Sequence, residues 1–114
     1  MTTTLNNFVS ETQLIAAETT LVSTLTSEKK FIGMMTVTNT SSVNVEVTLW
    51  RILTATTGTT TSGGNWTWKK VIPAGTTVIV DKLMGQVLGS LMKISGLAST
   101  ASVINVDISG TTET

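Results

Sequence analysis

Hydrophobic and polar residues alternate along most of this chain with a period close to two. The clearest run covers residues 43–53, where valine or leucine occupies every second position from Val43 to Leu49 and polar residues or Trp50 fill the positions between. A period of two places successive side chains on opposite faces of a β-strand. The run therefore predicts a strand with one buried face.

Similar runs recur, separated by turn-forming residues such as Pro73 and Gly75. They cover residues 13–17, 20–26, 31–39, 66–72, 76–80, 90–95 and 102–109. Within residues 31–39 we expect Phe31, Gly33, Met35 and Val37 to share a face. Strands spaced by roughly 8 to 12 residues, without a convincing helical segment, are typical of a β-sandwich or jelly roll. The pattern predicts an all-β fold, a jelly-roll-like antiparallel β-sandwich of about eight strands.

The first 18 residues carry mixed patterns. Hydrophobic residues recur only loosely at Phe8, Val9, Leu14 and Ile15. Ser10, with Gln13 three residues later, would permit a short helical turn, but an extended arm ending in a first strand fits equally well. We therefore divide the chain into an N-terminal arm, 1–18, and a β-sandwich domain, 19–114. The Thr-, Ser- and Gly-rich stretch 55–65 is expected to join two hairpin strands.

Composition narrows the class of protein. The chain has 114 residues, enough for one domain. Only 12% of its residues are charged, against about 25% in soluble domains, so we expect some apolar surface to lie between subunits. Seven Lys or Arg residues balance seven Asp or Glu residues, which argues against nucleic acid and anionic membranes as partners. Residues 1–7 are polar and Thr-rich, so we do not expect them to be a signal peptide. No apolar run approaches the roughly 18 residues of a membrane helix.

Catalytic chemistry has few candidate residues. The sequence contains no His, Cys or Tyr, which removes the usual general base, thiolate nucleophile and soft metal ligands. The carboxylates are scattered over turns and outward strand positions, where solvated surface charges are expected. Ser62 to Asn65 reads as a hairpin tip, because phosphate capture requires a helix N-terminus. We predict a protein that is not an enzyme and uses no metal or cofactor.

The tryptophans allow two interpretations. Trp66 and Trp68 lie two residues apart and share a strand face, where they could stack a sugar ring or base. Alternatively, they pack within the sandwich or between subunits, because one indole buries about 150 to 250 Å². We favour packing on this argument of area.

Several apolar residues are expected to face outward, because their neighbours in sequence face the core. These are Trp50, Ile79, Leu91 and Val103. Apolar residues exposed on adjacent strands suggest a contact patch. The candidate interface residues are Phe8, Val9, Leu14, Trp50, Trp66, Trp68 and Leu91.

The order of the motifs from residue 20 to residue 110 resembles small bacteriophage virion proteins of the β-sandwich kind. Phe31 to Ser41 is similar to their apolar strand followed by an Asn-Thr-Ser turn, and residues 43–49 to the β-branched strand that comes next. Ile72 to Thr76 is similar to their Ile-Pro-Ala-Gly turn, and residues 102–110 to their last strand, which ends in Ser-Gly.

The resemblance implies a capsid decoration (cement) protein, of a family whose members are jelly-roll-like and assemble as trimers on the shell. On this reading the protein is made in the host cytoplasm and is located on the capsid surface. Its partners would be the major capsid protein and its own copies, and it would stabilise the shell by bridging adjacent capsomers. The alternative is a carbohydrate- or receptor-binding β-sandwich module of a phage tail. A tail or head-completion subunit would share the physics of the first hypothesis.

Overall fold

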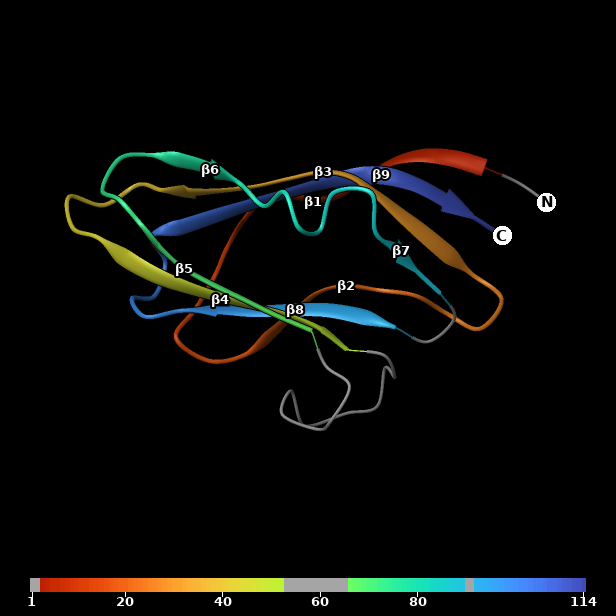
Figure 1. The fold of residues 1–114 in the computed structure, drawn as a ribbon, viewed down its shortest axis with the longest axis horizontal. Helices are drawn as coiled ribbons and strands as arrows, with labels where there is room; N and C mark the ends of the chain where they lie inside the picture. The colour runs from red at the N-terminus through yellow and green to blue at the C-terminus, as the bar shows by residue number, and fades with distance from the viewer. Residues whose placement is uncertain (1–2, 53–65, 90–91) are drawn as a thin grey trace.

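Two antiparallel β-sheets lie face to face and enclose one hydrophobic core (Figure 1). The computed structural model describes residues 3–52, 66–89 and 92–114, without the side chains of Ser10, Glu11 and Trp66. The first sheet has the order β1 (Thr3–Gln13), β9 (Ile104–Glu113), β3 (Lys29–Asn39) and β6 (Thr77–Ile79), with β7 (Val87–Leu88) also beside β3. The second has the order β2 (Thr19–Ser23), β8 (Lys93–Ala98), β4 (Val45–Ile52) and β5 (Trp66–Ile72).

The expected all-β antiparallel sandwich is confirmed, and the described residues contain no helix. They form nine strands, where the sequence predicted about eight. The prediction of a strand over residues 13–17 was wrong, because β1 ends at Gln13 and residues 14–18 form no strand. The two strands without a predicted counterpart are β1 and the two-residue β7, which lies in a stretch that showed no alternation in the sequence.

The core is built from the alternating residues of the central strands. Val45, Val47 and Leu49 of β4 have no exposed surface, and neither do Ile104 and Val106 of β9. Fully burying one such side chain contributes about 1.5 to 3 kcal/mol. The alternation in these two strands therefore identified inward-facing positions correctly.

A β-bulge in β3 changes which side chains face the core. Ile32 pairs with Gly110, but the next pair joins Met34 to Ser109, so Gly33 is the extra residue. An extra residue shifts the inward and outward alternation by one position. Ile32 and Met35 are fully buried, whereas Phe31 and Met34 are each 44% exposed. The prediction that Phe31 shares a face with Met35 was therefore wrong, because alternation in a sequence does not reveal a bulge.

Gly110 allows the two strands to approach at this bulge. A Cβ atom at Gly110 would lie only 1.8 Å from the carbonyl oxygen of Phe31. No side chain fits there without a shift of the backbone, so glycine is required where β3 and β9 meet.

The segment expected as a separate arm is part of the sandwich. β1 pairs with β9 from Thr3 opposite Glu113 to Gln13 opposite Asn105, with two irregularities in register. Val9 is 5% exposed and Leu14 is fully buried. Paired backbone groups and buried aliphatic side chains fix the segment to the first sheet. The irregular register explains why the sequence showed only a loose repeat here.

Two predicted connections can be followed. In the turn after β5, the Thr76 amide donates to the Pro73 carbonyl over 3.2 Å, and Gly75 has the positive φ of 68° expected there. The predicted loop 55–65 lies outside the described residues. The strands on either side of it pair as hairpin strands do, from Val45 opposite Ile72 to Arg51 opposite Trp66.

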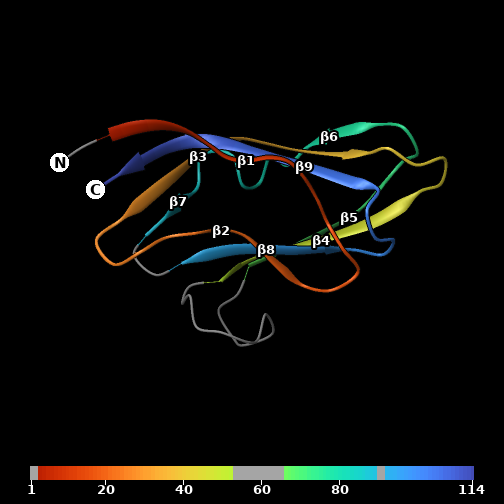
Figure 2. The same ribbon diagram turned by 180° about the vertical axis from the view of Figure 1, so that it is seen from behind.

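The two ends of the chain lie side by side at one end of the sandwich, as both ribbon views show (Figures 1 and 2). This proximity follows from the pairing of Thr3 with Glu113.

Candidate interaction surface

The residues predicted to form an interface occupy different environments. Val9, Leu14 and Trp68 belong to the hydrophobic core, Phe8 is partly buried against it, and Trp50 is half-buried. The side chains of Trp66 and Leu91 lie outside the described residues. Phe8 and Trp50 are thus the described members of the set with accessible surface, and the interface itself remains a prediction.

The position of Trp68 can be compared with the two interpretations of the tryptophans, ligand stacking and packing. Its side chain is 9% exposed and packs in the core cluster. An indole in this position contributes to the sandwich and is not available to stack on a ligand at the surface. For Trp68, the packing interpretation matches its place in the structure.

A row of mainly apolar side chains crosses the outer face of the first sheet. Leu5 of β1 lies opposite Thr111 of β9, which lies opposite Phe31 of β3, which in turn lies opposite Val87 of β7. Residues directly opposite each other in neighbouring strands point to the same face. Leu5 is 84% exposed and Val87 is 49% exposed. Together with Met34, which lies two register positions further along opposite Ser109, we call this surface the outer apolar row.

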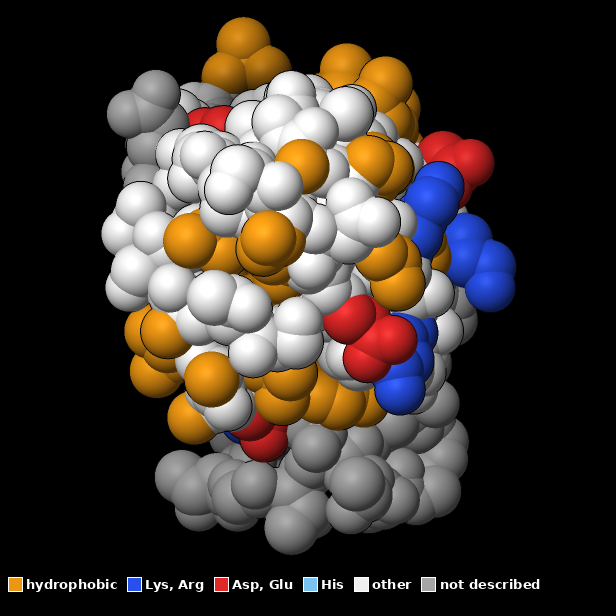
Figure 3. All heavy atoms as spheres, turned by 90° about the vertical axis from the view of Figure 1, so that its left-hand side faces the viewer, with side chains coloured by type: hydrophobic (Ala, Val, Ile, Leu, Met, Phe, Trp, Pro, Cys, Tyr) orange, Lys and Arg blue, Asp and Glu red, His pale blue; other side chains and the backbone are white. Residues whose placement is uncertain are grey.

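Figure 3 views the molecule from the end of the sandwich opposite the chain termini, with the first sheet at the top. There, hydrophobic side chains project beyond the surrounding polar atoms. The same view shows further hydrophobic atoms over the end of the sandwich that faces the viewer. Charged side chains gather along one side. Apolar groups are thus presented on the outer face of a sheet as well as in the core.

One end of the outer apolar row is concave. A hollow of about 420 Å³ is lined by Phe31, Val87 and Thr111, with Lys29 and Glu113 at its rim. These five residues belong to β3, β7 and β9. At the opposite end of the row, Leu5 protrudes. The row therefore carries a hollow and a protrusion on one face.

The rim of the hollow carries opposite charges. Lys29 and Glu113 are register partners on β3 and β9. The ion pairs found in the described part of the chain join Lys30 to Glu28 over 3.1 Å and Lys69 to Glu46 over 3.6 Å. Lys29 and Glu113 thus take part in neither of these pairs.

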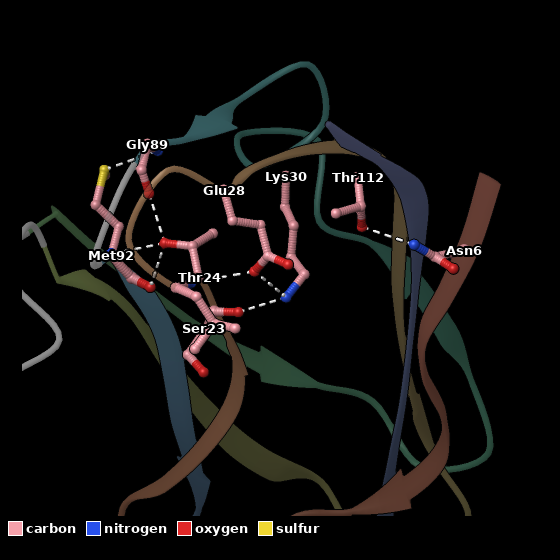
Figure 4. A network of polar contacts seen from close by, with 9 residues as sticks. Asn6, Ser23, Thr24, Glu28, Lys30, Gly89, Met92 and Thr112 are labelled. Atoms are coloured by element: carbon pink, nitrogen blue, oxygen red, sulfur yellow. Dashed lines mark hydrogen bonds and ion pairs between the residues drawn. The ribbon is translucent and has the colours of Figure 1, made fainter. Parts of the chain in front are cut away.

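A polar network below this surface holds the start of β3 in place (Figure 4). The ammonium group of Lys30 donates to the Ser23 carbonyl over 2.5 Å and to Glu28 over 3.1 Å, and it lies 5.7 Å from the centre of the Phe8 ring. The Leu25 amide donates to the Glu28 carboxylate over 3.1 Å. This backbone bond, and then the bond from Lys30, lower the pKa of Glu28. The network links β1, the end of β2 and β3.

A second set of bonds in the same view fixes β2 to the start of β8. The Thr24 hydroxyl donates to the Gly89 carbonyl over 2.5 Å, and the Met92 amide donates to that hydroxyl over 2.9 Å. Beside them, the Asn6 amide donates to the Thr112 hydroxyl over 2.6 Å. These bonds stabilise the end of the sandwich above which the outer apolar row lies.

Sequence reasoning identified this surface only in part. Ile79 was expected to face outward and is 52% exposed, whereas Val103, expected outward, is partly buried against the core. Leu5 and Val87 were missed, because neither lies in a run that alternates regularly. Phe31 was assigned to the wrong face because of the bulge. The low content of charged residues was the one indication in the sequence that apolar groups would be exposed.

The carboxylates of the described chain are spread over its surface. Glu18 accepts a hydrogen bond from the Ser95 hydroxyl over 2.7 Å, and Glu46 faces Lys69. Within residues 3–52, 66–89 and 92–114, no group of three or more His, Cys, Asp or Glu side chains is placed to hold a metal ion. The described chain also has no helix that is long and apolar enough to cross a membrane.

Comparisons of the chain with protein-family models, with curated proteins and with solved structures find no match.

Proposed function

We propose that the protein is a non-enzymatic structural subunit of a bacteriophage virion. Its role would be that of a capsid decoration (cement) protein, which binds the outside of the shell and bridges adjacent capsomers. The jelly-roll-like arrangement and the association with its own copies, which the sequence resemblance implies, are part of this proposal.

The outer apolar row is the observation that carries the proposal. A small sandwich that exposes Leu5, Phe31, Met34 and Val87 on one sheet face presents apolar area that association with other subunits would cover. A chain without net charge is also not held apart from its copies by long-range repulsion.

Binding to the assembled lattice alone would stabilise the particle by mass action. A ligand that binds only the closed shell shifts the equilibrium away from opening, by an amount that grows with its concentration relative to Kd. Several weak contacts made by one assembly would add through avidity. Neither effect requires a reacting side chain.

The test uses virions of the phage that carries the gene. We expect the protein in purified virions, at the outer surface of the head in electron cryomicroscopy. Purified protein added to heads that lack it should sediment with them, saturate at a fixed number of copies, and raise the temperature at which they release DNA. Density confined to the tail, or protein that stays in the supernatant, would contradict the proposal.

A further inference from the structure

We infer that the outer face of the first sheet is the contact between two copies of this chain, packed face to face about a two-fold axis. This inference rests on the self-association part of the proposed function and deepens it, but it assigns two-fold symmetry where the sequence resemblance implies trimers. It names the surface, the symmetry and the residue pairs.

The order of side chains in the outer apolar row is self-complementary. Across β1, β9, β3 and β7 the row reads Leu5, Thr111, Phe31 and Val87. A two-fold axis that runs along the strands between β9 and β3 reverses this order in the second copy. Leu5 then lies opposite the partner's Val87, and Phe31 lies opposite the partner's Thr111. Such an isologous contact uses the same patch on both subunits.

Shape supports the same pairing. Leu5, the most exposed large hydrophobic residue in the described part of the chain at 84%, protrudes at one end of the row. The hollow of about 420 Å³ is lined by Thr111, Phe31 and Val87, so it extends from β9 across β3 to β7. The two-fold axis places each leucine opposite the partner's Val87, at the β7 side of the partner's hollow. One contact would therefore bury both leucines against the two hollows.

The charges at the rim follow the same symmetry. Lys29 and Glu113 lie side by side on β3 and β9, on either side of the proposed axis. Reversal places Lys29 opposite the partner's Glu113, and Glu113 opposite the partner's Lys29. Two ion pairs, one on each side of the axis, would therefore border one edge of the outer apolar row. A different protein could bind here in the same way only if its surface also placed a negative and a positive charge beside an apolar row.

The size of the face suits a stable dimer. The strands of the first sheet run along the 45 Å axis of the molecule and lie side by side along the 20 Å axis (Figure 1). Standard interfaces bury about 800 Å² on each partner. Sheets that pack face to face lie about 10 Å apart with interdigitating side chains, which the outer apolar row can supply.

The first experiment measures mass in solution by sedimentation velocity over a range of micromolar concentrations, without capsids. We expect a species of twice the 12.0 kDa chain mass. Val87→Lys should weaken the dimer by about tenfold or more, because it places a charge against the partner's Leu5. The matched control is Val71→Lys on the second sheet, since Val71 is 50% exposed and Val87 is 49% exposed. This control should leave the dissociation constant unchanged within about twofold.

The second experiment uses the two rim charges. Lys29→Glu alone and Glu113→Lys alone should each weaken the homodimer, because like charges would then face each other across the axis. An equimolar mixture of the two variants should restore it, because every rim pair of the mixed dimer is again of opposite sign. Restoration by mixing separates an intermolecular contact from an effect on folding, since the fold of each chain does not change on mixing.

A monomer at all concentrations, a trimer, or a dimer that Val87→Lys leaves intact would overturn the inference. So would a mixture that associates no better than either variant alone. Particle binding is measured separately on the same variants. If Val87→Lys abolishes particle binding while the wild type is monomeric, the face docks on the shell, and the inference fails while the proposed function stands. If the dimer behaves as expected but no particle binds it, the proposed function fails.

Discussion

Asn39 is the side chain through which the end of β3 is joined to the second sheet. Its amide nitrogen donates to the Val43 carbonyl over 2.8 Å and to the Ile72 carbonyl over 2.9 Å. Its amide oxygen accepts from the backbone amide of Ser41 over 2.9 Å and from the Ser41 hydroxyl over 2.7 Å. The side chain is fully buried, and each of its polar atoms has partners in the turn or on β5.

Asn39→Ala should lower the free energy of unfolding by about 2 to 4 kcal/mol, because it leaves the Ile72 carbonyl unsatisfied inside the protein. Asn39→Asp should cost at least as much, since a carboxylate cannot donate to either carbonyl. Urea denaturation followed by tryptophan fluorescence measures both. Thr40→Ala, next to it and exposed, is the control, and a similar loss in that variant would contradict the role given to Asn39.

Glu28 makes the stability of the sandwich dependent on pH. Its pKa is lowered in the folded state by the Leu25 amide and then by Lys30, so the folded protein binds a proton less readily than the unfolded chain. The stabilisation is complete above the pKa of an ordinary glutamate and is lost as the pH falls through the lower pKa of the folded state.

Glu28→Gln should therefore destabilise the protein slightly at pH 7, by about 0.5 kcal/mol, and should have no effect well below pH 4. Denaturation midpoints of the two proteins, measured from pH 7 to pH 3, should converge as the pH falls. Glu46→Gln is the control, because the Glu46 pair with Lys69 is exposed. A Glu28→Gln deficit that persists unchanged in acid would show that the carboxylate charge is not responsible.

At the scale of the strand, β1 is the edge strand of the first sheet and pairs along one side of β9. Removing residues 2–13 would leave the backbone groups of β9 unpaired on one side and remove the buried Val9. We expect this deletion to lower the free energy of unfolding by about 3 kcal/mol or more, or to prevent soluble expression.

The matched control removes residues 2–4 only, which keeps Val9 and most of the pairing between β1 and β9. Thermal unfolding by circular dichroism compares the two proteins with the wild type. An unchanged midpoint after removal of residues 2–13 would show that the segment is an independent arm, as the sequence alone suggested.

The strands that could be read from the sequence are those with uninterrupted alternation. β4, predicted over residues 43–53, spans Val45–Ile52, and β5, predicted over residues 66–72, matches Trp66–Ile72. β1 and the orientation of Phe31 could not be read, because bulges shift the alternation. The outer apolar row depends on register between strands distant in sequence, such as Leu5 with Thr111. Periodicity within one strand does not contain that information.

At the scale of the whole molecule, one core is shared by both sheets. The cluster of buried residues includes Val9 of β1, Val47 of β4, Leu88 of β7 and Ile108 of β9. Small domains with a single core unfold in one cooperative transition. The division into an arm and a sandwich domain predicts instead that the N-terminal segment unfolds by itself.

Tryptophan fluorescence can distinguish a single unfolding transition from separate unfolding of the N-terminal segment. All three tryptophans lie on β4 or β5 of the second sheet. Fluorescence therefore reports on the second sheet, while far-ultraviolet circular dichroism reports on both. We expect the two midpoints in urea to coincide. A loss of circular dichroism that precedes the fluorescence change would show that β1 separates first.

The adjacent ends of the chain have a practical consequence. Thr3 and Glu113 are register partners beside the rim of the hollow, so a tag or cargo fused to either end would emerge from the same pole of the sandwich. A bulky fusion there would obstruct the face-to-face contact, whereas an insertion at the exposed Thr100, in the turn between β8 and β9, would leave it open. Affinity tags for assembly measurements should therefore be cleaved, or placed at that turn.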